Sequence, residues 1–166
     1  MSQASISDMR DAKLILYTDG ACSQTTGGFG SILVRPDTKQ HIKFGGGPYK
    51  DTTNNQMEMM AVIAGLEFAH TRMGPQDLLV ISDSKYVING ITEWIHGWKR
   101  NGWFTSAGKV VKNESLWKRM EAEVNRHRAI EFKWVKGHNG NEFNEMADQI
   151  AVAYRESDIE KLTVKV

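Results

Sequence analysis

The sequence predicts an α/β fold: a five-stranded mixed sheet, antiparallel in its first three strands, with helices on both faces. Three predicted strands precede the first long helix, and helices then alternate with two further strands, an order that requires a mixed sheet. The segments 13–19 (KLILYTD) and 77–83 (DLLVISD) are apolar on both alternating faces, which is typical of central strands. A length of 166 residues without repeats or a linker predicts a single domain, residues 1–166.

The first three strands are expected near the start of the chain. Gly20 follows the strand 13–19 and is expected to turn the chain, which would place Asp19 at or near the end of that strand. Two further strands, at 27–34 and 41–46, are separated by glycine and by a proline-containing turn, so an antiparallel meander is predicted.

Helices and strands alternate in the rest of the chain. Apolar residues at helical spacing predict a helix from Asn55 to about Met73, with Glu58 in its first turn. The strand 77–83 places Asp83 at its end. The later elements are a helical region with an internal glycine, a projection rich in glycine, lysine and tryptophan, a helix, a strand and a final helix, at 84–95, 97–113, 114–127, 130–135 and 141–155.

The composition is that of a folded protein without a strong electrostatic bias. With 40% hydrophobic residues and a net charge of +1, the chain could hold a polyanion only through a local basic patch. The single cysteine, Cys22, excludes an internal disulfide and a multi-cysteine zinc site. Because no apolar run reaches membrane-spanning length, we expect a cytoplasmic protein without membrane association, and its small size favours a monomer.

Four acids lie in or beside apolar segments, where a lone carboxylate is costly to bury: Asp19, Glu58, Asp83 and Asp148. Each has a simpler explanation when it is considered alone. Asp19 could open a turn, Glu58 could interact with a helix dipole, and Asp83 could cap the following helix. Asp148 could lie in a solvated salt bridge.

Taken together, the four acids could converge at one edge of the sheet, which is the usual location of sites in open sheets. A cluster of oxygen ligands without cysteine favours Mg²⁺ or Mn²⁺ over Zn²⁺. The chemistry suited to such a cluster is two-metal phosphoryl transfer, here the hydrolysis of a phosphodiester.

The segments around these acids resemble those of a known family, bacterial-type type I ribonuclease H. They cover nearly the whole chain in order and are YTDGAC (17–22), TTNNQMEMMA (52–61), SDSKYVINGITEWIHGWKRNGW (82–103), VKN (111–113) and WVKGHNGNEFNEMAD (134–148). The resemblance implies a ribonuclease H-like fold with a basic protrusion. It also implies that two Mg²⁺ ions, or Mn²⁺, are bound by Asp19, Glu58, Asp83 and Asp148. The expected activity is endonucleolytic cleavage of the RNA strand of RNA–DNA hybrids, which leaves a 3′-hydroxyl and a 5′-phosphate.

His138 lies in a glycine-flanked segment between the last strand and the last helix, where a loop is expected. Considered alone, it would be a surface residue. The resemblance implies instead a proton shuttle or general base that assists the attacking water or product release. Glu145 also matches a family acid, but a solvated salt bridge explains it equally well.

The resemblance further implies which residues hold the hybrid. Asn54 and Asn55 correspond to minor-groove contacts, and Thr53 to a residue that grips a DNA phosphate, although TTNN could also cap a helix. The projection interleaves aromatic and basic residues, as a surface that follows a nucleic-acid backbone would. The candidates there are Trp94, Lys99, Arg100, Lys109 and Lys112, whereas Trp98 and Trp103 could serve only to pack the projection.

Some positions depart from the family pattern. The segment 23–30 (SQTTGGFG) is about two residues shorter than the family's loop, so substrate contacts assigned to that loop are in doubt here. Gly97 replaces a common polar residue, and Phe104 stands where a basic residue is frequent. Two alternatives remain: a hybrid-binding module that does not cut, and a DNA nuclease or strand transferase on the same scaffold. The four retained acids argue against the first, and TTNN with the basic projection against the second.

Overall fold

The computed structural model describes residues 4–137 and 140–157. Its centre is a five-stranded sheet with the strand order β3-β2-β1-β4-β5. The strands are β1 (Leu14–Ser23), β2 (Thr26–Val34), β3 (His41–Tyr49), β4 (Asp77–Ser82) and β5 (Ala129–Trp134). The first three pair antiparallel, and β1 pairs parallel with β4 and β4 with β5. The predicted mixed sheet is therefore confirmed.

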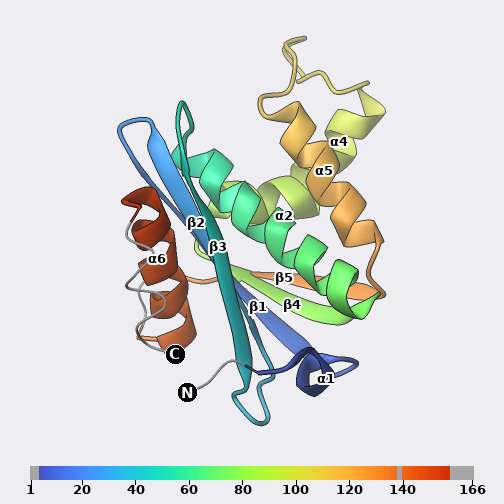
Figure 1. The fold of residues 1–166 in the computed structure, drawn as a ribbon. Coiled ribbons are helices and arrows are strands. Elements are labelled where there is room, and N and C mark those ends of the chain that lie inside the picture. Colours follow the sequence, from blue (N-terminus) through green and yellow to red (C-terminus); the bar gives the residue numbers. More distant parts are fainter. Residues whose placement is uncertain (1–3, 138–139, 158–166) are drawn as a thin grey trace.

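Helices cover both faces of this sheet, as predicted. They are α1 (Ile6–Met9), α2 (Asn54–Met73), α3 (Lys85–Asn89), the π-helix η1 (Gly90–Trp94), α4 (Ile95–Arg100), α5 (Glu114–Asn125) and α6 (Glu142–Arg155). Helix α2 packs on β1 and β2 from one side, and α6 packs on β1, β2 and β3 from the other (Figure 1). Helix α4 and the segment 101–113 that joins it to α5 extend past the edge of the sheet, where the projection 97–113 was expected. Within the described residues, no helix has the length and apolarity needed to cross a membrane.

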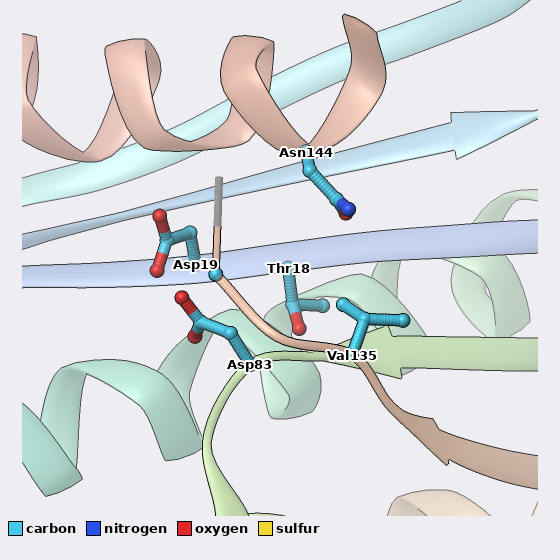
Figure 2. A pocket seen from close by; sticks show the side chains of 6 residues that line it. Thr18, Asp19, Asp83, Val135 and Asn144 are labelled. Atoms are coloured by element: carbon cyan, nitrogen blue, oxygen red, sulfur yellow. The ribbon is translucent and has the colours of Figure 1, made fainter. Parts of the chain in front are cut away.

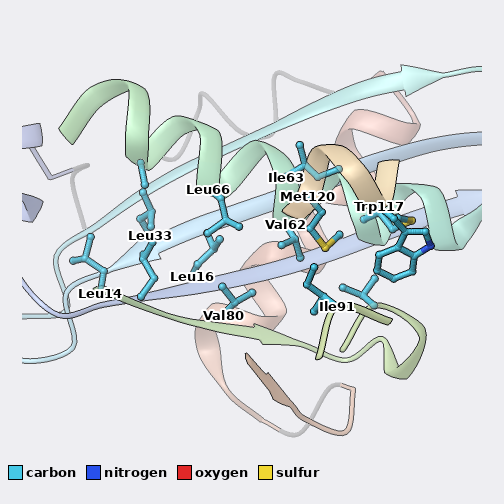
Figure 3. Close-up of a cluster of buried hydrophobic side chains, with 14 of the residues drawn as sticks. Leu14, Leu16, Leu33, Val62, Ile63, Leu66, Val80, Ile91, Trp117 and Met120 are labelled. Carbon is cyan, nitrogen blue, oxygen red and sulfur yellow. The ribbon is translucent and has the colours of Figure 1, made fainter. Parts of the chain in front are cut away.

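Two groups of buried apolar side chains attach the helices to the sheet. Because successive side chains of a strand point to opposite faces, Leu14 and Leu16 of β1 belong to the larger group beneath α2 (Figure 3). Tyr17 belongs to the smaller group beneath α6, where its ring lies 5.4 Å from that of Phe143. Strand β1 is thus buried on both faces, as its apolar sequence predicted.

Strand β1 does not end at Gly20, so the prediction of a turn there is wrong. Asp19 pairs with Gly30 and Gly20 with Phe29, and the ladder continues to the pair Ser23 and Thr26. The long partner strand supplies backbone partners that a local glycine signal does not reveal. Asp19 therefore lies inside the strand. Most of the segment 23–30 belongs to strands, and only a two-residue turn separates Ser23 from Thr26.

The helical segment after β4 contains a π-helical stretch where Gly90 meets α5. A Cβ atom at Gly90 would lie 2.0 Å from Cη2 of Trp117, whose side chain is fully buried. The Trp117 ring also contacts Tyr86 at 5.2 Å and Trp98 at 5.5 Å, and Trp98 contacts Trp103. Trp98 and Trp103 thus pack the projection, which confirms that alternative.

The variant Gly90→Ala is expected to lower the free energy of unfolding by about 1–3 kcal/mol, because the added methyl group overlaps the Trp117 ring. The matched control is Gly97→Ala in α4, where no atom other than Arg100 Nη2 at 3.9 Å would approach the new methyl group. We expect that control to gain up to about 1 kcal/mol from helix propensity. Urea unfolding measures both changes, and a loss of the same size in both variants would contradict the packing argument.

Candidate active site

Three carboxylates converge where the centre of the sheet meets the start of α2. Asp19 lies in β1, Glu58 in α2, and Asp83 directly after β4. One oxygen from each lies within 4.8 Å of those of the other two, and they are the one such group of three among the described residues. Asp19 and Glu58 are buried and Asp83 is half-buried. Figure 2 shows Asp19 and Asp83 next to one another.

The pairing of β1 with β4 brings Asp83 beside Asp19. The two strands are parallel, with Tyr17 opposite Ile81. Two residues further along each chain, Asp19 and Asp83 emerge side by side at the carboxyl end of β4. Carboxyl ends of parallel strands are the usual location of sites in open sheets. The predicted convergence of these two acids is therefore found.

Gly20 brings the third acid into contact with the other two. A Cβ atom at Gly20 would lie 2.5 Å from the backbone nitrogen of Glu58 and 2.6 Å from the carbonyl carbon of Met57, so only glycine allows α2 to approach β1 this closely. The Gly20 N–H donates to Asp19 Oδ1 at 2.9 Å and also to Glu58 Oε1. One backbone amide therefore orients two of the three carboxylates.

Burial and the neighbouring acids disfavour the charged form of Asp19 and of Glu58. Burial, with the charges of Asp83 and Asp148 adding to it and a Glu58 hydrogen bond opposing it, raises the pKa of Asp19 to about 7. Burial also raises the pKa of Glu58 well above its ordinary value, and the neighbouring Asp19 and Asp83 raise it further. A cation bound between the oxygens would supply the missing positive charge. Because all the donors are carboxylate oxygens, the site fits a hard divalent ion such as Mg²⁺ or Mn²⁺.

Asp148 lines the same open pocket as the three acids, from the other side of the sheet on α6. It is half-buried, and its charge raises the pKa of Asp19. Its oxygens are not part of the group that lies within 4.8 Å. The structure thus brings all four predicted acids to one pocket, with three in close contact and Asp148 beside them.

The local explanations for single acids can now be compared with the geometry. Ser84, not Asp83, caps α3, since its side chain accepts a hydrogen bond from the Val87 N–H at 3.1 Å. Helix α2 starts at Asn54, so Glu58 lies beyond the first turn, and the expectation that it occupies that turn is wrong. Asp19 opens no turn, because it pairs within β1.

The TTNN segment lies next to the carboxylates. Thr53 is the N-cap of α2, and its side chain accepts a hydrogen bond from the Gln56 N–H at 3.1 Å, which confirms the capping alternative. Asn54 and Asn55 are exposed and line the acidic pocket. Because Thr53 caps the helix, the side chains of Asn54 and Asn55 are not needed for capping and face solvent at the pocket.

The basic candidates of the projection lie apart from the acidic pocket, whose lining includes none of them. Trp94 is 40% exposed at the base of the projection, with its ring 6.0 Å from that of Tyr86. Lys99 is bound to Glu121 of α5 at 2.8 Å. The remaining three, which are exposed, are Arg100, Lys109 and Lys112.

The predicted loop histidine, His138, lies outside the described residues. The chain that leads to it passes the acids, since a Cβ atom on Gly137 would lie 3.0 Å from Asp83 Oδ2. Glu145 is exposed on α6 and does not line the acidic pocket. Sequence reasoning did not single out Lys85, which lines the pocket two residues after Asp83. The sequence signal that could have found Lys85 is its place two residues after an acid at the end of a predicted strand.

Comparison with known proteins identifies the family. The RNase H family model matches residues 11–156. The chain belongs to the ribonuclease H family. It is 47% identical over 153 residues to a ribonuclease H of Rhodospirillum rubrum, covering 91% of this chain and 88% of the relative. It is 51% identical over 138 residues to a ribonuclease H of Chromobacterium violaceum, covering 82% of this chain and 90% of the relative.

Solved structures of this family share the fold. A type 1 RNase H with the type 2 active-site motif superposes with a TM-score of 0.74 at 29% identity, covering 89% of this chain and 74% of that one. The RNase H1 of the archaeon Halobacterium salinarum gives a TM-score of 0.65 at 24% identity, covering 88% and 99%, which supports the fold alone. The ribonuclease H-like fold implied by the sequence is therefore confirmed.

The raised pKa of Asp19 predicts how stability depends on pH when no metal is present. Between its ordinary value of 3.8 and about 7, the folded protein holds a proton on Asp19 that the unfolded chain has released. Raising the pH through this window therefore lowers the free energy of unfolding, by about 1.4 kcal/mol per unit of pKa difference. Asp19→Asn removes this contribution because the amide stays neutral.

Denaturant unfolding at several pH values in a chelator measures this difference between wild type and Asp19→Asn. The control is Glu131→Gln, which alters an exposed acid on β5. We expect Asp19→Asn to gain stability relative to wild type as the pH rises to 8, and the control to stay parallel to wild type. A constant difference between wild type and Asp19→Asn at all pH values would show that Asp19 ionises normally.

Proposed function

We infer that this protein is a metal-dependent endoribonuclease that hydrolyses the RNA strand of RNA–DNA hybrids. The observation that supports this most strongly is the contact of Asp19, Glu58 and Asp83, whose oxygens lie within 4.8 Å of one another in a chain of the ribonuclease H family. Two of these carboxylates are buried and one is half-buried, and the one basic side chain in the described lining of the pocket, Lys85, is exposed. A divalent ion explains the cluster, and phosphodiester hydrolysis is the chemistry that such a site supports.

The finer proposal is that two Mg²⁺ ions, or Mn²⁺, are held by Asp19, Glu58, Asp83 and Asp148. Support comes from the donor set, which consists only of carboxylate oxygens, and from Asp148 at the margin of the same pocket. When bound, such ions activate water and stabilise the leaving oxygen. The products would carry 5′-phosphate and 3′-hydroxyl ends.

Other residues of the chain would hold and orient the substrate. The Gly20 N–H fixes the Asp19 and Glu58 carboxylates before any ligand binds. We propose that Asn54 and Asn55 contact the minor groove, where the 2′-hydroxyl distinguishes RNA from DNA, because both are exposed at the acidic pocket. Thr53 would contact a phosphate of the DNA strand. For His138 we propose transfer of a proton to or from the attacking water or the product.

The projection is proposed to contact the DNA strand through its cations and through Trp94. Trp94, Lys99, Arg100, Lys109 and Lys112 are the candidates, and all five are exposed. Lys99 differs from the others because Glu121 already neutralises it. Arg100, Lys109 and Lys112, which have no ion pair among the described residues, are therefore expected to contribute most to binding. That the protein is a cytoplasmic monomer stays a prediction.

Asp19→Asn is expected to lower the rate of hybrid cleavage by at least about 100-fold, because removal of one charged ligand weakens the metal site. Binding of the hybrid should change little. The assay compares labelled RNA–DNA hybrid, double-stranded RNA and double-stranded DNA in the presence of Mg²⁺, with Glu131→Gln as the control. Wild type should cut only the RNA strand of the hybrid. Binding of the hybrid without cleavage would favour a binding module, and cleavage of double-stranded DNA would favour a DNA nuclease.

The double variant Arg100→Ala, Lys109→Ala is expected to raise KM for the hybrid and to reduce the slope of log(kcat/KM) against log salt, by up to roughly one unit for each phosphate that is no longer bound. The turnover number should stay close to that of wild type, because neither residue lines the acidic pocket. Lys118→Ala is the control, since this lysine is bound to Glu114 at 2.7 Å. An unchanged salt slope in the double variant would rule out the proposed contact.

A further inference from the structure

Lys85 is a cation at the acidic pocket that binds none of its acids. It begins α3 directly after the N-cap Ser84 and lines the pocket together with the carboxylates. Among the described residues, no ion pair includes Lys85. Its ammonium nitrogen lies instead 4.7 Å from the centroid of the Trp134 ring. The Lys85 ammonium group therefore lies near the acids but forms no ion pair with them.

Trp134 is fixed to the same segment that supplies Asp83. It is the last residue of β5, and its indole N–H donates to the backbone carbonyl of Asp83 at 3.0 Å. The ring is 39% exposed, so one face is available to the ammonium group. A cation on an exposed ring is bound only weakly and can exchange to a stronger anionic partner. The ring thus limits where the Lys85 ammonium can lie while it leaves that group available.

We propose that Lys85 binds a non-bridging oxygen of a phosphate in the RNA strand, next to the bond that is cut, and that Trp134 positions it. The inference rests on the proposed function. The four acids repel the anionic backbone of a substrate when they are ionised, so phosphate binding at this pocket needs positive charge, and Lys85 would add to that of the proposed metal ions. Lys85 is the one lysine or arginine in the described lining of the pocket. An ammonium is a compact point charge that suits a single phosphate oxygen.

The first test compares wild type, Lys85→Ala and Lys85→Arg in steady-state cleavage of the hybrid over a range of salt concentrations. Lys85→Ala should raise KM about 3- to 10-fold with a smaller change in kcat, and should reduce the salt slope of log(kcat/KM) by roughly one unit. Lys85→Arg should restore most of the slope. The control is Lys13→Ala, an exposed lysine directly before β1 at the other end of that strand. A wild-type salt slope in Lys85→Ala would overturn the proposal.

Two substitutions of Trp134 separate its ring from its N–H group. Trp134→Phe keeps an aromatic face beneath Lys85 but removes the hydrogen bond to Asp83, and Trp134→Leu removes both. The positioning role predicts a nearly normal KM and salt slope for Trp134→Phe. Trp134→Leu should match Lys85→Ala, with no further effect in the double variant. Equal KM and slope for Phe and Leu would refute the positioning role, and thermal unfolding of each variant checks that it is folded.

Neutral methylphosphonate linkages identify the strand that Lys85 contacts. Equilibrium binding is measured in the Asp19→Asn background, so that the hybrid stays intact. Neutral linkages in the RNA strand should abolish the difference in affinity between Lys85 and Lys85→Ala, whereas neutral linkages in the DNA strand should preserve it. The reverse result would overturn the assignment. If wild type does not cut the hybrid, the proposed function fails; if it cuts and Lys85→Ala keeps the salt slope, only this inference fails.

Discussion

The close contact between Gly20 of β1 and the backbone of α2 determines the arrangement of the site. Any side chain at Gly20 would overlap the backbone at Met57 and Glu58, and the Gly20 N–H holds the carboxylates of Asp19 and Glu58. The parallel pairing of β1 with β4 then brings Asp83 to the same point. The contact between β1 and α2 and the pairing between β1 and β4 thus assemble three acids that are far apart in the sequence.

This arrangement has an energetic cost that the rest of the fold must offset. Burial raises the pKa of Asp19 and of Glu58, so the protein without metal is less stable at neutral pH than it would be with neutral side chains there. The apolar groups on both faces of β1 supply the opposing stability. A divalent ion relieves the repulsion, and metal binding and folding are therefore thermodynamically coupled.

Much of the fold could be predicted because its signals are local. The double-sided apolar pattern of β1 and β4 and the helical spacing within α2 gave the element types and approximate positions. Features that depend on distant partners could not be predicted. Strand β1 passes through Gly20 because β2 pairs with it, and the π-helix lies at Gly90 where Trp117 packs against it. The position of Lys85 on Trp134 likewise depends on β5, which is remote in sequence.

The central claim, that Asp19 and Glu58 resist ionisation until a metal ion binds them, is tested most directly by calorimetric titration of Mg²⁺ into the metal-free protein near pH 7. Titrations in two buffers with different ionisation enthalpies give the number of protons exchanged with each ion. The account predicts a net release of protons, because the raised pKa of Asp19 and of Glu58 must fall as the metal binds, and a smaller release for Glu58→Gln. Binding without proton release, or with an unchanged release in Glu58→Gln, would contradict it.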